Sequence, residues 1–182
     1  QFVTVITETS DYGLFWDEFE TNKGCTSLNF RKKMAYRAYS HTAGYDASIS
    51  SWMSEQEKDD NPKKMIEVGS LVQNLRYGEN PHQRAAFYKD NSNSFGVGSA
   101  FQHQGKELSY NNINDTDAAF ELVCEFDQTS KSACAIIKHA NPCGVATGVN
   151  LKEAYKSAVS CDQTSAFGGV VALNQTLDKS TA

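Results

Sequence analysis

The sequence predicts an α/β fold, and three observations in its second half carry that prediction. Ala133–Ile137 is a short unbroken apolar run, which is typical of a strand buried on both faces. Asn150 and Glu153 have the spacing of a capping box, which predicts a helix from there to about Val159. Phe167–Leu173 then predicts another buried strand. The order strand, helix, strand indicates a sheet whose ligands bind outside the carboxyl ends of the strands.

The first part of the chain predicts one strand and three helices. Phe2–Thr7 is rich in β-branched residues, as strands are. Asp11–Phe19 follows as a first helix. Ser27 is a candidate N-cap for a second helix over Leu28–Tyr39, where apolar residues recur at helical spacing. We expect a third helix over Ala43–Met53.

A charged stretch, Glu55–Lys64, divides the chain. It has almost no residue to bury and contains Pro62, which ends a helix. The stretch therefore predicts a solvated linker between two domains, residues 1–64 and 65–182. The alternative is an ordinary surface loop inside a single domain.

Three further elements are predicted after this linker. Ile66–Leu75 predicts a strand. Asn114 predicts the N-cap of a helix that has acidic residues in its first turn and ends near Phe126. At the end of the chain, Thr176 and the residues after it predict the start of a further helix.

Composition argues against several classes of protein. The chain has 182 residues and a formal net charge of −5, so it has no basic field of the kind that attracts nucleic acid, and we expect no nucleic-acid partner. Its apolar runs are far shorter than the roughly 20 residues that span a bilayer. The five cysteines include no C-x-x-C pair and no quartet at zinc-ligand spacing. This usage favours free thiols in a reducing cytoplasm and no metal.

Lys138 and His139 come directly after the first buried strand. A neutral imidazole can take a proton from an attacking amine near pH 7, and a neighbouring ammonium favours the neutral imidazole. The lysine can stabilise a developing oxyanion. Both side chains reach one ligand only if the strand ends there, and the turn-forming residues of Asn141–Gly144 predict a loop at that point. The alternative is a solvated strand end.

Two other segments suit a phosphorylated ligand. Arg76 can bind a phosphate through its planar guanidinium while Tyr77 stacks on a heterocycle, and Gly78 permits an unusual backbone beside them. The paired glycines of Ser165–Gly169 allow a ligand to approach the backbone closely. Each segment also has a plain structural explanation, the first as a surface dipeptide and the second as a tight entry to a strand.

Four segments of the chain share their order and spacing with one known family. They are Leu75–Gln83, Tyr110–Asp115, Lys138–Gly144 and Ser165–Asn174. These segments resemble the bifunctional purine-biosynthesis enzymes, AICAR transformylase/IMP cyclohydrolase (the PurH family). Three earlier segments resemble the end of that family's cyclohydrolase domain: Thr9–Tyr12, Arg31–Tyr36 and His41–Asp46. The resemblance covers essentially the whole chain, but only the middle of the family's protein.

The resemblance implies the end of a methylglyoxal-synthase-like cyclohydrolase domain in residues 1–64. It implies the first part of a cytidine-deaminase-like α/β/α transformylase domain in residues 65–182. That domain transfers a formyl group from 10-formyltetrahydrofolate to AICAR, in a cytoplasmic homodimer and without a metal. His139 would be the general base on the amine, and Lys138 the transition-state stabiliser or the proton donor to the leaving folate nitrogen. The nucleotide would be held by Arg76, Tyr77, Asn114 and Gly168.

The resemblance also limits what this chain is expected to do alone. The family's cyclohydrolase loops and catalytic lysine lie before the position of Gln1, so we expect no cyclohydrolase activity. Much of the folate site lies beyond Ala182, so we expect weak or no formyl transfer. Two alternatives from other classes are a nucleotide-binding module without catalysis and a structural dimerisation module. Loss of formyl transfer on replacing His139 would argue against the first, and binding of AICAR would argue against the second.

Overall fold

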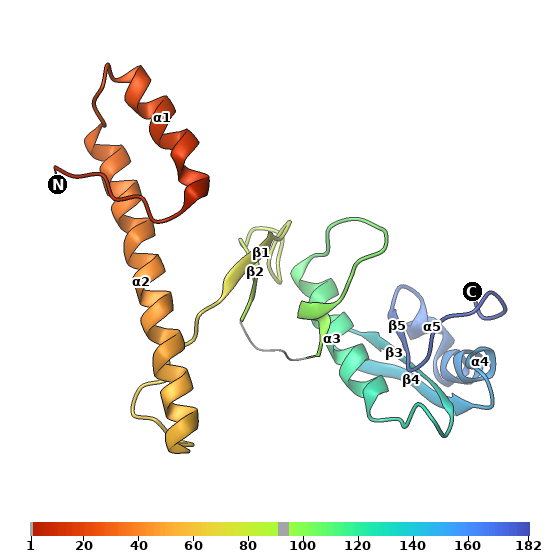
Figure 1. The fold of residues 1–182 in the computed structure, drawn as a ribbon. Helices are drawn as coiled ribbons and strands as arrows, with labels where there is room; N and C mark the ends of the chain where they lie inside the picture. The colour runs from red at the N-terminus through yellow and green to blue at the C-terminus, as the bar shows by residue number, and fades with distance from the viewer. Residues whose placement is uncertain (1, 91–94) are drawn as a thin grey trace. The chain divides into compact units, whose positions relative to one another are not determined.

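The structure is a computed structural model that describes residues 2–90 and 95–182. It divides into two compact units, Gln1–Gly69 and Ser70–Ala182. The first unit is helical and the second combines helices with two sheets (Figure 1). This mixture of helix and sheet agrees with the predicted α/β class. The assignment of residues 1–64 and 65–182 to two named domains stays a prediction.

The first unit consists of a 3-10 turn and two helices. They are η1 (Thr9–Asp11), α1 (Tyr12–Thr21) and α2 (Leu28–Glu57). The first predicted helix is confirmed, and so is the cap of the second. The hydroxyl of Ser27 accepts a hydrogen bond from the backbone N–H of Phe30 at 3.2 Å.

The prediction of separate second and third helices was wrong, because α2 is one continuous helix of 30 residues. Residues 40–42 include no proline, and the hydroxyl of Thr42 is satisfied within the helix. The hydroxyl of Thr42 donates to the carbonyl oxygens of Ala38 and Tyr39, at 3.2 and 3.1 Å. A hydroxyl bonded in this way does not draw the backbone out of the helix.

The prediction of a strand over Phe2–Thr7 was also wrong. A strand needs a neighbour to complete its hydrogen bonds, and no described strand pairs with this segment. The segment contacts the rest of the unit through a side chain, because the hydroxyls of Thr4 and Thr26 are 2.9 Å apart. Just after the segment, in η1, the buried carboxylate of Asp11 forms an ion pair with Arg37 of α2.

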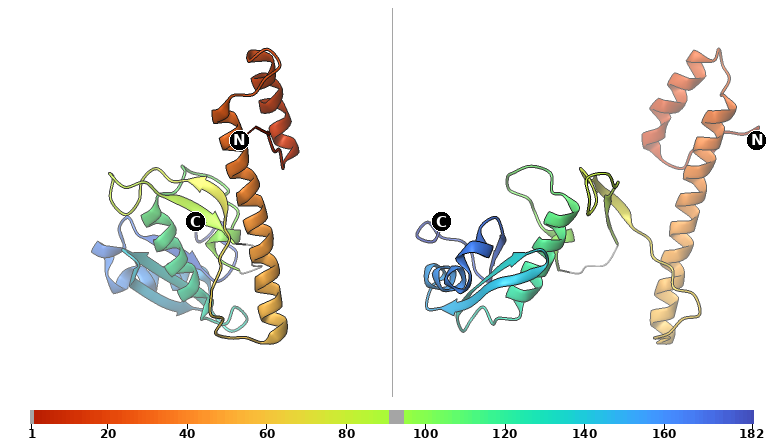
Figure 2. Two further views of the ribbon diagram at one scale, coloured as in Figure 1. Left: turned by 90° about the vertical axis from the view of Figure 1, so that its left-hand side faces the viewer. Right: turned by 180° about the vertical axis from the view of Figure 1, so that it is seen from behind.

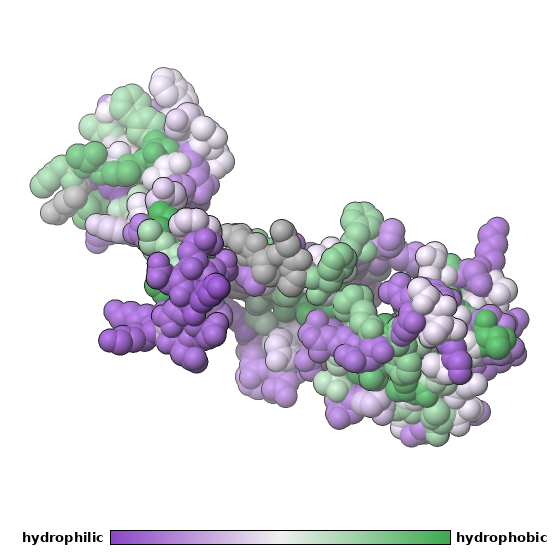
Figure 3. All heavy atoms as spheres, turned by 60° about the horizontal axis from the view of Figure 1, so that its bottom comes forward, coloured by the Kyte–Doolittle hydropathy of each residue, from purple (hydrophilic) through white to green (hydrophobic). Residues whose placement is uncertain are grey.

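The charged stretch begins inside α2, since Glu55–Glu57 are its last three residues. Lys58 ends the helix in the left-handed conformation, with φ at +54°. Residues 58–69 contain no helix or strand and are exposed. Figure 3 shows hydrophilic side chains gathered over the end of α2 and the segment that follows it.

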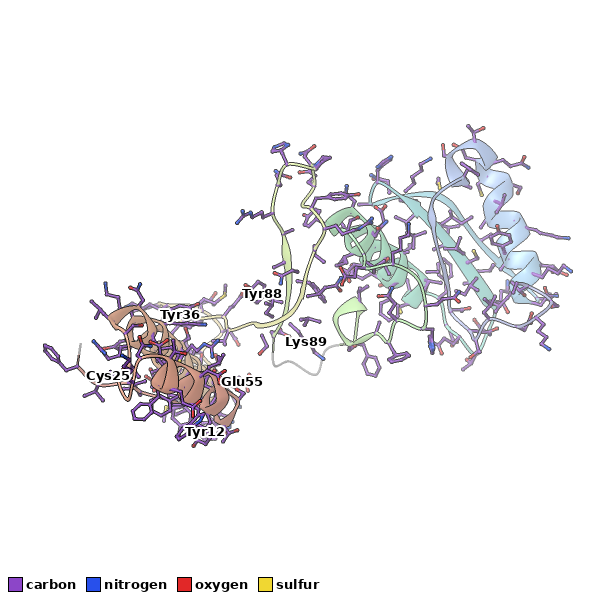
Figure 4. The ribbon with its side chains drawn as sticks, turned by 90° about the horizontal axis from the view of Figure 1, so that it is seen from above. Tyr12, Cys25, Tyr36, Glu55, Tyr88 and Lys89 are labelled. Atoms are coloured by element: carbon purple, nitrogen blue, oxygen red, sulfur yellow. The ribbon has the colours of Figure 1, made fainter. Side chains whose placement is uncertain are left out.

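The first unit buries few of its described apolar side chains. Met34 and Ala47, which lie 13 positions apart on α2, are its buried apolar residues. Tyr12 on α1 and Tyr36 on α2 leave 61% and 72% of their surface exposed (Figure 4). Trp16 and Trp52 are exposed by more than half as well. Much apolar surface of this unit is therefore not covered by the described residues.

The second unit contains a β-hairpin, a three-stranded sheet and its helices. In chain order its elements are β1 (Ser70–Asn74), β2 (Ala86–Lys89), η2 (Val97–Ser99), α3 (Tyr110–Cys124), β3 (Ser132–Lys138), β4 (Asn141–Gly148), α4 (Leu151–Cys161), α5 (Gln163–Ala166) and β5 (Val170–Leu173). β1 and β2 pair antiparallel, and the sheet has the order β4-β3-β5. The strand predicted over Ile66–Leu75 is confirmed only in its second half.

Helices cover both faces of the three-stranded sheet, which gives three layers (Figures 1 and 2). The side chains of the central strand β3 alternate between the two helices. Cys134 and Ile136 face α4, whereas Ala133 and Ala135 face α3. Both faces of β3 are therefore buried, which explains its unbroken apolar run and confirms the predicted strand.

β3 pairs antiparallel with both of its neighbours, β4 and β5. The carboxyl end of β3 therefore lies beside the amino ends of β4 and β5. This differs from the predicted arrangement, in which the site lies where the carboxyl ends of several strands meet. One edge of the sheet still gathers the residues that follow β3 and those that precede β5.

The loop predicted over Asn141–Gly144 was wrong, because these residues are the first half of β4. A two-residue turn returns the chain directly, since Lys138 pairs with Asn141. The register shifts next to Cys143, as Ile137 pairs with Pro142 and Ile136 with Gly144. This irregularity allows a proline to lie within the strand.

The start of α3 differs from the prediction, and the start of α4 confirms it. Ser109, not Asn114, caps α3 in a reciprocal capping box with Asn112. Asparagine occupies the position where glutamate or glutamine is usual, so the sequence does not signal this box. Asn150 caps α4, and its side chain accepts a hydrogen bond from the N–H of Glu153 at 2.9 Å.

The helix predicted from Thr176 does not form. The carboxylate of Asp178 accepts hydrogen bonds from the backbone N–H groups of Ser180 and Thr181, at 2.9 and 2.8 Å. These bonds fix a turn, because a short acidic side chain competes with helical hydrogen bonding. Among the described residues, no helix is long and apolar enough to cross a membrane.

The five cysteines are free, and their burial predicts different reactivities. Burial raises the pKa of Cys134 to about 11, so its thiol stays protonated at pH 8 and is a poor nucleophile. Cys25, Cys124 and Cys161 are exposed. Ellman's reagent at pH 8 should label these three rapidly and Cys134 only after urea is added. Rapid labelling of Cys134 in the folded chain, located by peptide mass spectrometry, would contradict its buried position.

Candidate functional site

Three of the predicted site residues lie at one edge of the sheet. Lys138 ends β3, His139 follows it in the turn, and Gly168 lies just before β5. The register brings these segments together, because Ile137 pairs with Val170. The ammonium of Lys138 donates a hydrogen bond to the carbonyl oxygen of Phe167 at 2.9 Å. The antiparallel pairing thus places the lysine beside the paired glycines.

The Lys138 ammonium has a second neighbour, Asp162, which caps the short helix α5. The pKa of the Asp162 carboxyl lies below its ordinary value, chiefly because Ser165 donates hydrogen bonds to it. The positive charge of Lys138 lowers that pKa further. An ammonium has three N–H donors and Phe167 takes one of them, so others are left for a ligand.

His139 and Ala140 form the turn between β3 and β4, and both have left-handed backbones. Their φ angles are +53° and +57°, as a type I′ hairpin turn requires. The side-chain amide of Asn141 donates to the carbonyl oxygen of His139 at 2.7 Å. His139 is exposed, so its imidazole is accessible from solvent. The turn therefore presents an accessible base at the end of a rigid strand.

Helix α3 contacts this turn through Asp115, which the sequence analysis did not single out as a site residue. Its carboxylate accepts a hydrogen bond from the backbone N–H of Ala140 at 2.7 Å. The side chain of Asn114, one residue earlier, lines a cavity on another side of the helix. No local pattern in the sequence signals the contact between Asp115 and Ala140, because the two residues are 25 positions apart.

Arg76 and Tyr77 lie in the loop between β1 and β2, and that loop is held by its own hydrogen bonds. The backbone N–H of Gly78 donates to the carbonyl oxygen of Gln83 at 2.9 Å. The side chain of Gln83 accepts from the N–H of Asn80 at 2.8 Å. A Cβ on Gly78 would lie 2.9 Å from the Cβ of Gln83, so the loop requires a glycine there.

The two side chains at the start of this loop lie close to each other. The Arg76 guanidinium carbon is 5.6 Å from the centre of the Tyr77 ring, within the range of a cation–π contact. Arg76 is exposed and Tyr77 is half-buried. A guanidinium beside an aromatic ring suits a ligand that combines a phosphate with a heterocycle.

Helix α3 joins this loop to the sheet edge. The side-chain amide of Asn111 donates to the carbonyl oxygen of Glu79 at 3.2 Å, while Asp115, one turn later, contacts the turn at Ala140. A cavity of about 250 Å³ lies between the hairpin, η2 and this end of α3. Its lining includes Leu75, Phe87, Val97, Tyr110, Asn114 and Asp117.

The predicted residues therefore form two groups on either side of α3. Lys138, His139 and Gly168 are at the sheet edge, and Arg76 and Tyr77 are in the loop. Within residues 2–90 and 95–182, no hydrogen bond joins one group directly to the other. In the same residues, no three His, Cys, Asp or Glu side chains lie close enough together to hold a metal ion.

Comparison with known proteins gives a consistent result along the whole chain. A family model described as the AICARFT/IMPCHase bienzyme matches residues 1–182. The chain is 58% identical over 182 residues to the bifunctional purine biosynthesis protein PurH of Cereibacter sphaeroides (strain ATCC 17025 / ATH 2.4.3). It is 60% and 59% identical, over 181 residues each, to the proteins of that name from Dinoroseobacter shibae and Ruegeria pomeroyi.

These similarities cover all of this chain but only part of each relative. The match spans 100% of the chain and 34% of each of the three relatives. The chain therefore spans about a third of the length of the curated relatives it matches.

Proposed function

The chain belongs to the AICARFT/IMPCHase bienzyme family, and on that premise we propose that its second unit provides part of a formyl-transfer site. The substrate is AICAR, the formyl donor is 10-formyltetrahydrofolate, and no metal takes part. The observation that carries the proposal is the sheet edge, where an accessible imidazole and an ammonium are adjacent in the chain. When an amine attacks a carbonyl carbon, the imidazole can take the proton of the amine and the ammonium can stabilise the oxyanion that forms.

In the proposed reaction, the 5-amino nitrogen of AICAR attacks the formyl carbon. His139 takes the proton that this nitrogen loses as the new C–N bond forms. The formyl oxygen becomes an oxyanion, which the ammonium of Lys138 stabilises. When the bond to the folate nitrogen breaks, Lys138 or a group it polarises returns a proton to that nitrogen. The products are the formylated nucleotide and tetrahydrofolate.

The nucleotide is proposed to be held by residues of both groups. Arg76 binds the phosphate through its planar guanidinium, and Tyr77 stacks on the heterocycle. Asn114 offers an amide toward the cavity beside the loop. Gly168, with φ at +77° and open space around its Cβ position, lets the ligand approach the backbone. The ordered loop and the contact from Asn111 to Glu79 support this arrangement.

The finer architecture is proposed from the same premise. Residues 1–64 are the end of a methylglyoxal-synthase-like cyclohydrolase domain, and residues 65–182 begin a cytidine-deaminase-like transformylase domain. The three layers around β3 support the second assignment. We also propose a cytoplasmic homodimer. The free cysteines and the exposed aromatic side chains of α1 and α2 support that view.

Replacing Arg76 tests the nucleotide half of this proposal. The experiment uses an exchange enzyme, defined as the Cereibacter sphaeroides relative with its matched segment replaced by this chain. Losing a charge-assisted contact of about 1.5–3 kcal/mol should weaken AICAR binding roughly 10- to 100-fold in Arg76→Ala. Calorimetric titration measures the dissociation constant, and the rate of formyl transfer at saturating AICAR should change little.

Arg84→Ala is the matched control for this experiment, because Arg84 is an exposed arginine in the same loop. It should bind AICAR as the unmodified exchange enzyme does. Equal affinities for all three proteins would show that Arg76 does not bind the nucleotide. An Arg76→Ala variant that binds normally but transfers no formyl group would also contradict the assignment, since it would place Arg76 in the chemical step.

A further inference from the structure

The turn at His139 and Ala140 adopts a conformation that its own sequence does not favour. Type I′ turns need positive φ at both central positions, and asparagine followed by glycine is the usual choice. Here the second position is Ala140, with φ at +57°. A Cβ in the left-handed region clashes with the following carbonyl oxygen, so an alanine is disfavoured there. Contacts from elsewhere in the fold must therefore help to hold the turn.

One such contact comes from helix α3. In a two-residue hairpin turn, the N–H of the second turn residue has no partner within the hairpin. Asp115 provides that partner, because its carboxylate accepts the hydrogen bond of the Ala140 N–H at 2.7 Å. This distance is typical of strong hydrogen bonds to an ionised acceptor. The carboxylate thus binds the residue whose backbone is least favoured.

Asp115 lies in a part of the fold that can hold the turn in place. Asp115 is half-buried and lies in the interior of the 15-residue helix α3, whose start is held by the capping box of Ser109. From the other side, Asn141 donates to the carbonyl oxygen of His139 at 2.7 Å. The Ala140 N–H and the His139 carbonyl oxygen, one backbone group from each turn residue, are therefore bonded to side chains. Disfavoured backbone conformations that the surrounding structure holds in place are common at functional sites.

We propose that Asp115 is a positioning residue, whose carboxylate holds the His139–Ala140 turn and so sets the direction of the His139 imidazole. This inference rests on the proposed role of His139 as the general base. Asp115 acts through the Ala140 backbone and takes no part in proton transfer. Because His139 and Ala140 are exposed, the contact contributes to the geometry of the turn more than to the core.

The test uses four variants of the exchange enzyme, with His139→Ala as the reference for loss of the general base. Asp115→Ala removes the acceptor, and Asp115→Asn keeps an oxygen that can accept the same hydrogen bond. Ala140→Gly removes the backbone penalty, because glycine adopts positive φ freely. The fourth variant combines Asp115→Ala with Ala140→Gly. Steady-state kinetics gives kcat and KM for AICAR, and circular dichroism with urea unfolding checks that each variant is folded.

Asp115→Ala should lower kcat roughly 10- to 100-fold with little change in KM, since misplacing a catalytic group by about 1 Å costs on the order of 10²-fold. Asp115→Asn should retain most of the activity. Ala140→Gly alone should be close to the unmodified enzyme. The double variant should regain most of the lost kcat, because a glycine turn no longer depends on the carboxylate. A purely structural role for Asp115 would give no such rescue.

The outcomes separate this inference from the proposed function. If Asp115→Ala has the unmodified kcat while His139→Ala is inactive, the positioning role is wrong and the proposed function stands. If the double variant is as slow as Asp115→Ala, the positioning role is also wrong. If His139→Ala keeps the full rate, the proposed function fails and the inference fails with it. Amide exchange at Ala140 in the 182-residue chain adds a readout without activity. It should be faster in Asp115→Ala, and an unchanged rate would overturn the inference.

Discussion

Replacing Gly144 by alanine should lower the free energy of unfolding of the second unit by about 3 kcal/mol or more. A Cβ at this position would overlap the backbone oxygen of Ala158 in α4 and lie 2.8 Å from its carbonyl carbon. A backbone oxygen cannot rotate aside as a flexible side chain can, so the whole helix has to shift. Since domains are stable by about 5–15 kcal/mol, this is a large share of the total.

The position of Gly144 belongs to a wider contact between β4 and α4. A Cβ on Gly148, four residues later on the same face of the strand, would lie 2.7 Å from the backbone nitrogen of Ala154. Ala154 and Ala158 are themselves one helical turn apart and fully buried. Small residues on both elements thus let the helix approach the strand closely.

Amide exchange of the β3 strand measures this effect, because β3 is at the centre of the unit. Gly144→Ala should reduce the protection of the β3 amides. The fluorescence of Trp16 and Trp52 reports on the first unit, which should unfold at the same urea concentration as in the unmodified chain. Gly13→Ala is the matched control, since its Cβ meets open space within α1 and alanine favours a helix. Unchanged protection of β3 in Gly144→Ala would show that α4 does not lie so close to β4.

The sequence predicted best where local residues decide the structure. The strand β3 was predicted because both of its faces are buried, which leaves an unbroken apolar run. The caps Ser27 and Asn150 were predicted because each is bonded within the next three residues. For the two caps, the determining contact lies within three positions of the residue that signals it. For β3, the apolar run is itself the signal, although the helices that bury it lie elsewhere in the chain.

The predictions failed where distant contacts or unusual turn residues decide. Phe2–Thr7 has the composition of a strand, but composition does not supply a neighbouring strand. The density of proline and glycine at the start of β4 predicts a loop, but these residues lie in the strand. Its glycine at 144 serves the close approach of α4 instead of a turn. The actual turn contains no glycine, so its local sequence does not indicate it.

The candidate site shows the same division. Lys138 and His139 were singled out from their place after a buried strand, and the structure places them at the sheet edge beside the Gly168 segment. Their supporting contacts could not be predicted, because Asp115 and Phe167 are 25 and 29 positions away along the chain. Asn114 was singled out for its side chain and predicted as a cap. It lies instead inside α3, facing the cavity.

The second large effect is expected from His139→Ala in the exchange enzyme. A positioned general base typically contributes 10²- to 10⁴-fold to a rate, which corresponds to about 3–5 kcal/mol of the barrier. The variant should still bind AICAR with unchanged affinity, since Arg76 and Tyr77 lie in a different loop. It should also unfold as the parent protein does, because His139 is exposed in the turn.

His103→Ala is the matched control, because His103 is an exposed histidine of the same unit, and its ring packs edge-to-face against that of Phe101. The decisive measurement is the rate of formyl transfer at saturating AICAR and 10-formyltetrahydrofolate in His139→Ala, with the AICAR dissociation constant measured on the same sample. We expect a fall of 10²- to 10⁴-fold at unchanged affinity, with His103→Ala unaffected. A rate within a few-fold of the unmodified exchange enzyme would contradict the account, because the sheet edge would then carry no catalytic base.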